Sequence, residues 1–259
     1  MVRRISALIV ILAALGIGFV YLARPRAPGL LAHDAVAVPV GETLEIYFTL
    51  ENIGGPDALL AAASAAAGRA VIVRPEAFDN TPIPAGSRPV FARDGVYLRL
   101  EDPQQGLQAG ALIPLVLTFA EAGEVALKAR VAGAEAAAMD PHALHRNMEI
   151  DSGDSSAELS LEVTRQADGE GWDLAVETRN FEFFRPDQPE SDVPDRPGQG
   201  HAHLYLNGLK LGRLYSNGAT IGALPPGRYT VRVALNSNRH RPVMAGGKPV
   251  EARAEITAQ

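Results

Sequence analysis

The chain has 259 residues, of which 47% are hydrophobic and 21% are charged, and its formal charge is −6 at neutral pH. This length favours about two globular domains, and the negative charge argues against a nucleic-acid partner, which would need a basic surface. There is no cysteine, so disulfide bonds, zinc–cysteine sites and thiol nucleophiles are excluded, and only 4 Met and 6 His could hold a soft metal ion.

Residues 1–29 are predicted to be a membrane anchor or an export signal. Arg3 and Arg4 precede an uncharged apolar stretch, residues 5–22, that is long enough to cross the hydrocarbon core as a helix. Residues 21–24 form a poor cleavage site, which favours a retained single-pass transmembrane helix over a secreted protein with a cleaved signal peptide. With the arginines inside, the bulk of a bacterial protein would lie in the periplasm, tethered to the inner membrane.

Short apolar runs between Gly and Pro residues predict a β-domain over residues 30–136. Its predicted strands are residues 43–50, 70–73, 96–100, 112–119 and 125–131. Residues 57–67 are alanine-rich and have helical propensity. They are interpreted instead as a strand followed by a loop, because of a family resemblance.

Four phrases within residues 35–133 resemble the periplasmic copper chaperone family PCu(A)C in order and approximate spacing. They are Leu-Glu-Asn-Ile-Gly at 50–54, the alanine-rich run ending in Gly-Arg at 62–69, Ile-Pro-Ala-Gly at 83–86, and residues 115–119 followed by 122–125. The resemblance implies a cupredoxin-like β-barrel or sandwich. It also implies a copper cargo and a copper-acceptor partner such as a respiratory oxidase.

The copper ligands of that family are missing from this region. The family has a His after the Gly-Arg step, where this chain has Val73, and a later His-x-Met pair, where it has Tyr97 and Arg99. No Met or His occurs between His33 and Met139. Because copper(I) needs thioether or imidazole ligands, the resemblance here implies a scaffold without the family's site.

Residues 137–156 are predicted to be a linker that carries potential ligands. These ligands recur at every third position: Met139, His142, His145 and Met148. Asp140 and Pro141 could begin a short helix, and a segment that folds around an ion could use three of the four ligands. Two thioethers and two imidazoles suit copper(I). The alternative is a surface helix on which these residues are incidental.

Residues 157–259 are predicted to form a second, immunoglobulin-like β-sandwich. Alternation of apolar and polar residues predicts half-buried strands at 159–163, 172–176 and 229–235. The dipeptide Asn207-Gly208 predicts a tight hairpin turn between two further strands. Residues 181–197 are rich in Pro and Asp and are predicted to form a long loop.

A second group of potential ligands lies in this domain, which looks like a His-bearing β-domain of copper-related proteins. On a strand, His201, His203 and Tyr205 would face the same side, so the two imidazoles could chelate one ion. Further ligands could come from His240 and Met244, although the arginines on either side of His240 would repel a cation. The alternative is that the paired histidines are surface or hydrogen-bonded structural residues.

Three functions follow from these patterns. The leading hypothesis is a membrane-anchored periplasmic protein that holds copper, most simply copper(I), and delivers it by ligand exchange as a chaperone or reservoir. The second is a metal-free interaction or assembly protein that uses a degenerate copper-chaperone scaffold. An enzyme is the least favoured, because the chain has no hydrolase, metalloprotease, phosphate-loop or dinucleotide motif and therefore no predicted catalytic residue.

Overall fold

The computed structural model describes residues 29–75, 78–133, 155–167, 169–187 and 193–259. All regular structure within these ranges is β-strand, which confirms the all-β prediction. In the same ranges there is no helix that could cross a membrane. The predicted anchor falls on residues 1–28, outside the described part of the chain.

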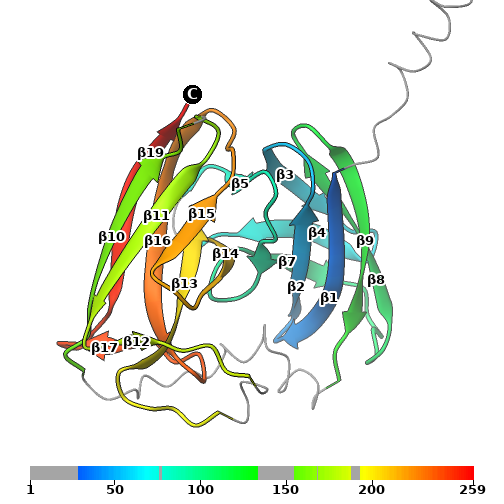
Figure 1. Ribbon diagram of the computed structural model, residues 1–259. Helices are drawn as coiled ribbons and strands as arrows, with labels where there is room; N and C mark the ends of the chain where they lie inside the picture. Colours follow the sequence, from blue (N-terminus) through cyan, green and yellow to red (C-terminus); the bar gives the residue numbers. More distant parts are fainter. Residues whose placement is uncertain (1–28, 76–77, 134–154, 168, 188–192) are drawn as a thin grey trace, which may run out of the picture.

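Nine strands form the N-terminal half, which lies on the right in Figure 1. They are β1 (Leu30–Val40), β2 (Thr43–Asn52), β3 (Asp57–Ala63), β4 (Ala67–Val73), β5 (Thr81–Ile83), β6 (Val90–Phe91), β7 (Tyr97–Pro103), β8 (Leu112–Phe119) and β9 (Gly123–Val131). Their apolar faces enclose one core, in which the rings of Phe48 and Phe91 stack with centroids 4.2 Å apart. The alanine-rich stretch begins with strand β3, as the resemblance implied and against its helical propensity.

Ten strands form the C-terminal half, on the left in Figure 1. They are β10 (Glu158–Arg165), β11 (Trp172–Arg179), β12 (Glu182–Phe183), β13 (Gln199–Leu206), β14 (Leu209–Leu214), β15 (Gly218–Ile221), β16 (Gly227–Ser237), β17 (Met244–Ala245), β18 (Lys248–Pro249) and β19 (Glu251–Ala258). The sheet β10–β11–β15 and the strands β19–β16–β13–β14 share a second core, in which Trp172 of one sheet and Val231 of the other are buried. The predicted Asn207-Gly208 turn joins β13 to β14, with positive φ at both residues.

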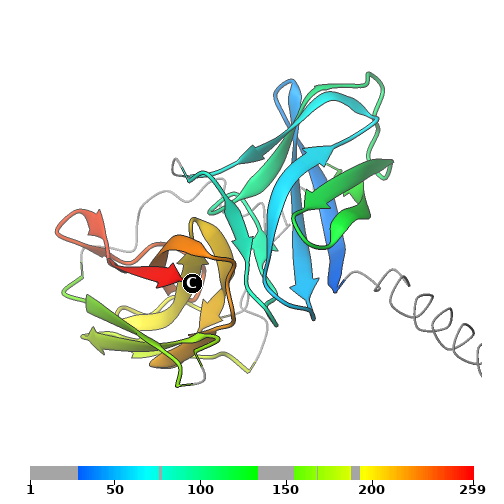
Figure 2. The same ribbon diagram turned by 90° about the horizontal axis from the view of Figure 1, so that it is seen from above.

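The two halves are joined by backbone pairing as well as by the linker. Lys210 of β14 pairs with Val90 of β6, so strands of both halves belong to one 14-stranded sheet. Leu209 packs into the N-terminal core, and the amide of Ala85 donates a hydrogen bond to the carbonyl oxygen of Ala223 (2.9 Å). Seen from above in Figure 2, each half curls around its own core and the two lie side by side. The sequence patterns predicted neither β6 nor this contact.

Candidate metal centre

Strand β13 carries the first two histidines, and a glycine sets how closely it approaches its neighbour. β13 pairs antiparallel with β16, and Gly200 stands opposite Ser237. A Cβ atom on Gly200 would lie only 2.1 Å from the carbonyl oxygen of Asn236, so only glycine fits there without displacing the strands. The close approach brings His201, the next residue on β13, beside the end of β16.

The period-two alternation along β13 is confirmed. Ala202 and Leu204 point into the C-terminal core, whereas His201 and His203 lie on the opposite face. Each of these histidines is only 1% exposed, so they are not the surface residues that one alternative proposed. Buried imidazole nitrogens need polar partners, and here His201 and His203 are partners of each other.

The third histidine, His240, lies in a turn that directly follows β16. The turn is closed by two backbone hydrogen bonds, from the amide of His240 to the carbonyl of Ser237 (3.0 Å) and from the amide of Ser237 to the carbonyl of Arg241 (2.8 Å). The amide of Arg239 also donates to a carboxylate oxygen of Asp195 (2.8 Å). His240 adopts φ = 63°, a left-handed conformation that is unfavourable for most side chains.

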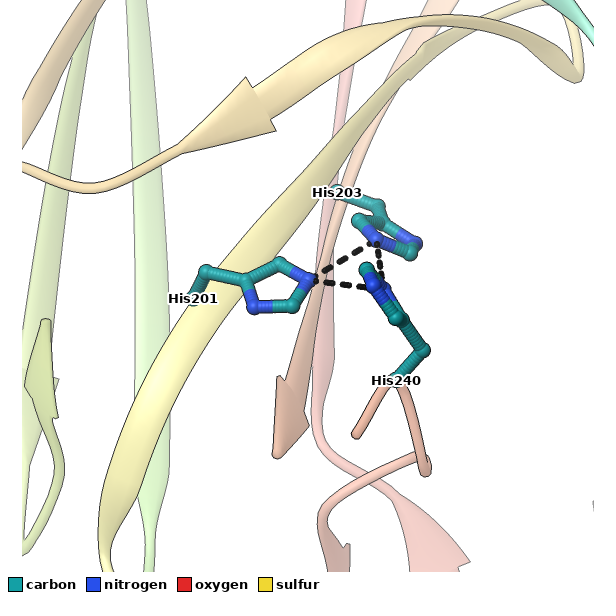
Figure 3. A group of neighbouring side chains, drawn as sticks. All are labelled: His201, His203 and His240. Atoms are coloured by element: carbon teal, nitrogen blue, oxygen red, sulfur yellow. Dashed lines mark hydrogen bonds between the residues drawn. The ribbon is translucent and has the colours of Figure 1, made fainter. Parts of the chain in front are cut away.

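Three ring nitrogens converge in the space between β13 and this turn (Figure 3). Nε2 of His201 is 3.0 Å from Nε2 of His203 and 3.1 Å from Nδ1 of His240. The remaining pair, Nδ1 of His240 and Nε2 of His203, is 3.4 Å apart. Among His, Asp and Glu side chains of the described residues, this is the one group with metal-ligand spacing.

These separations fit three imidazoles around one small cation. Ligand nitrogens about 2.0–2.1 Å from a tetrahedral ion lie about 3.3–3.4 Å from one another, and smaller angles at the ion bring them closer. The three measured distances fall at or just below this value. The residues present therefore fit a transition-metal ion with three nitrogen ligands, a donor set that suits copper and zinc better than magnesium or calcium.

The number of protons that the three converging nitrogens can carry also favours a bound ion. Each ring nitrogen has one in-plane direction, which holds either a proton or a lone pair. Only one proton fits between three nitrogens that converge on one point, because a second proton would point at the first and be repelled by it. An ion at that point would accept all three lone pairs at once.

His203 is held from behind by groups of both halves. Its Nδ1 lies 3.2 Å from the hydroxyl oxygen of Tyr205 and 3.4 Å from Oδ2 of Asp94, a residue of the N-terminal half. The same carboxylate oxygen accepts hydrogen bonds from Tyr205 (2.9 Å) and from Lys210 (2.8 Å). Burial, followed by the positive charge of Lys210, holds the pKa of His203 well below its usual value. The ring is therefore neutral at pH 7 and able to act as a ligand.

Asp195 lies beside the two arginines that counted against this site. Nε of Arg241 lies 3.9 Å from Oδ2 of Asp195, the residue that also holds the backbone of Arg239. Asp195 thus offsets part of the positive charge that the sequence places next to His240.

Of the other predicted ligands, only Met244 lies within the described residues. Met244 is buried in β17, with 8% exposure, and its backbone carbonyl accepts a hydrogen bond from the amide of Ser155. Met139, His142, His145 and Met148 lie outside the described residues. Asp94 was missed by sequence reasoning, because no spacing pattern relates an aspartate in one half to a histidine in the other.

A small apolar cluster occupies the region of Val73 and Tyr97. These two residues stand opposite each other on β4 and β7, and they pack with Tyr47 and Val38. Nη2 of Arg99 donates a hydrogen bond to the hydroxyl of Tyr97 (2.8 Å). Buried Glu45 accepts a hydrogen bond from Tyr47 and lies 3.3 Å from Nη1 of Arg93. The side chains of this region are thus engaged with one another.

Known proteins that resemble part of this chain include one family model and several solved structures. A family model described as "Putative lipoprotein LpqE-like" matches residues 26–131. Similar solved structures include the apo PCuAC domain from PmoF1, with 25% identity and a TM-score of 0.39, covering 42% of this chain and 98% of that domain. The copper-bound PCuAC domain from PmoF2 shows 22% identity, a TM-score of 0.38 and coverage of 42% and 96%. The copper(I) form of DR1885 from Deinococcus radiodurans shows 21% identity, a TM-score of 0.35 and coverage of 42% and 81%. No curated protein matches the chain.

Proposed function

We propose that this protein binds a copper ion through His201, His203 and His240 and serves as a copper chaperone or reservoir. The observation that carries the proposal is the convergence of three imidazole nitrogens at 3.0–3.4 Å. Two of the three side chains are almost fully buried. One cation can accept the lone pairs of all three nitrogens, whereas each mutual hydrogen bond needs a proton on one of them.

The choice of copper rests on two further observations. Residues 35–133 resemble the PCu(A)C copper chaperones in sequence, and the matched PmoF2 domain is described as copper-bound. The chain also holds thioethers at Met139, Met148 and Met244, which are soft ligands that favour copper(I) over zinc. Met139, His142, His145 and Met148 would take the ion from, or pass it to, the three histidines.

Transfer by ligand exchange needs no redox step and no catalytic residue. An incoming ligand from the acceptor replaces one imidazole at a time, so the ion never leaves a coordinating environment. His240 is the first candidate to leave, because it lies on a turn and is more exposed than the two strand histidines. In this proposal residues 1–29 anchor the protein to the inner membrane, with the bulk in the periplasm, and the LpqE-like lipoprotein match supports an extracytoplasmic location. The acceptor implied by the family resemblance is a copper-dependent protein such as a respiratory oxidase.

A metal-free interaction protein is the second candidate. It is favoured by one observation. Val73, Tyr97 and Arg99 stand where the resemblance would place the family's copper ligands, and their side chains pack or hydrogen bond with neighbours. In this reading both β-domains are recognition surfaces. The two candidates differ in whether the C-terminal histidines bind an ion.

The deciding experiment is a competition titration of the full chain with copper(I), copper(II) and zinc(II) against chelators of known affinity. The test variant carries His201→Ala, His203→Ala and His240→Ala, and the matched control carries His33→Ala, the same change at a histidine of β1 in the other half. A second variant with His142→Ala and His145→Ala separates the linker from the strand site.

We expect one tightly held copper ion in the wild type and in the His33 control, and its loss in the triple variant. Tight binding that survives the triple variant and disappears with the linker variant would move the site to residues 139–148. No copper binding in the wild type would overturn the proposal and leave the interaction protein.

A further inference from the structure

The turn between β6 and β7 reaches from the N-terminal half to the back of the histidine cluster. It is closed by hydrogen bonds from the amide of Ala92 to the carbonyl of Val96 and from the amide of Gly95 to the carbonyl of Ala92, both 2.9 Å. A Cβ on Gly95 would lie 2.7 Å from the carbonyl oxygen of Gly208, so the turn fits closely against the β13–β14 hairpin. This contact places the carboxylate of Asp94 beside His203.

The hydrogen bonds around that carboxylate determine which nitrogen of His203 carries its proton. Tyr205 donates its hydroxyl hydrogen to Oδ2 of Asp94 (2.9 Å). Towards Nδ1 of His203, the Tyr205 oxygen and the carboxylate can then only accept a hydrogen bond. Nδ1 must therefore carry the proton of the neutral ring, and Nε2, the atom that faces His201 and His240, keeps a lone pair.

We propose that Asp94 is a positioning residue for the ion site. Its carboxylate lies in the other half of the molecule, contacts His203 across the boundary and fixes the ring as the Nδ1–H tautomer. The inference rests on the proposed function, because it concerns the same three histidines. A carboxylate behind a ligating histidine orients the ring and strengthens the ligand, and loss of such a group typically weakens metal binding by 10- to 100-fold.

The arrangement also couples ion affinity to the docking of the two halves. When the halves separate, Asp94 leaves His203, while Lys210, a cation of the C-terminal half, stays beside it. The ion is then held by a ring without its fixed tautomer, beside a lysine whose ion pair with Asp94 has been broken. A partner that opens this boundary would lower the affinity for the ion, and the ion in turn favours the docked state. Release to an acceptor could thus be triggered away from the ligands themselves.

The test uses the full chain with two double variants. Asp94→Ala combined with Lys210→Met removes the carboxylate together with its buried cation, so that neither charge is left unpaired. The hydroxyl hydrogen of Tyr205 then has no carboxylate partner and can turn to Nδ1 of His203. Asp173→Ala combined with Lys248→Met makes the same change of charge at two exposed residues of β11 and β18. Imidazole ¹⁵N NMR of the metal-free protein reads the tautomer, and the chelator titration reads the affinity for copper(I).

We expect His203 to be the Nδ1–H tautomer in the wild type and in the exposed-charge control, and to shift towards Nε2–H in the Asp94/Lys210 variant. Copper affinity should fall 10- to 100-fold in that variant and stay unchanged in the control. A wild type that binds copper, but whose tautomer and affinity survive the Asp94/Lys210 variant, overturns the inference and leaves the proposed function standing. A wild type that binds no copper overturns the proposed function, and the role of Asp94 in ion binding with it, whatever the tautomer.

Discussion

Gly200 lies directly against the backbone of Asn236, so closely that a methyl group in place of its hydrogen would be 2.1 Å from the Asn236 carbonyl oxygen. This contact fixes the spacing of β13 and β16 one residue before His201. Gly200 therefore affects the position of His201, because the distance between these strands sets how far the His201 ring is from the turn that holds His240.

Gly200→Ala should therefore damage the ion site as well as the fold. The added methyl group forces the strands apart, at a cost of about 1–3 kcal/mol in the free energy of unfolding, and moves His201 away from His240. We expect copper affinity to fall at least about tenfold, as measured by chelator competition, with the stability loss measured by chemical denaturation. The control is Gly218→Ala on β15, where the new methyl group meets only ordinary contacts. Unchanged copper binding in Gly200→Ala would show that strand spacing does not set the site.

The left-handed conformation of His240 predicts a conflict between stability and ion binding. His240→Asn replaces the residue by one that tolerates φ = 63° and removes one of three crowded ring nitrogens. We expect the metal-free variant to be as stable as the wild type or more stable by up to about 1 kcal/mol, while its copper affinity is lost. A marked loss of stability in the metal-free variant would assign His240 a structural role instead, and His33→Asn controls for the exchange itself.

The buried state of His203 predicts how the metal-free protein responds to pH. Its pKa is lowered in the fold, first by burial and then by Lys210 and His240, although Asp94 acts in the opposite direction. Below about pH 6.5 the unfolded chain binds a proton at this residue that the folded chain does not bind. The stability that this group contributes is therefore complete above that pH and falls as the pH decreases.

We expect the free energy of unfolding to fall by up to about 1.4 kcal/mol per pH unit below pH 6.5 on account of this one group. Urea denaturation of the chelator-treated protein between pH 7.5 and 5 measures the slope. His203→Gln should flatten it. Equal slopes in the wild type and in His203→Gln would contradict the buried, neutral state.

Hydrogen exchange tests the proposed coupling between the ion and the boundary of the two halves. The amides of Ala92 and Gly95 form hydrogen bonds within the turn that carries Asp94. If the ion favours the docked state, copper should slow exchange at both amides, although neither residue is a ligand. Amides of β8, on the far side of the N-terminal core, provide the reference. Slowing confined to residues 201–203 and 237–241 would show that the ion acts only on its own ligands.

Much of the architecture could be predicted from local patterns. Period-two alternation identified β8, β9, β11 and β16 at or near their observed bounds, because a strand with one buried face must alternate. The Asn-Gly pair identified the β13–β14 turn, since both residues accept positive φ. The short strands β6, β12, β17 and β18 were not predicted, because two residues are too few to show a period.

The sequence by itself determined that the chain is β-rich, that it lacks cysteine, and that His201 and His203 share one face of a strand. It also indicated His240 as a neighbour, since that residue follows a strand expected in the same domain. Only the tertiary structure decided that the three ring nitrogens converge and that Asp94 supports one of them from the other half. The reason is physical: alternation reports which face of a strand is buried, whereas strand register and the contact between the halves depend on long-range packing that leaves no local pattern.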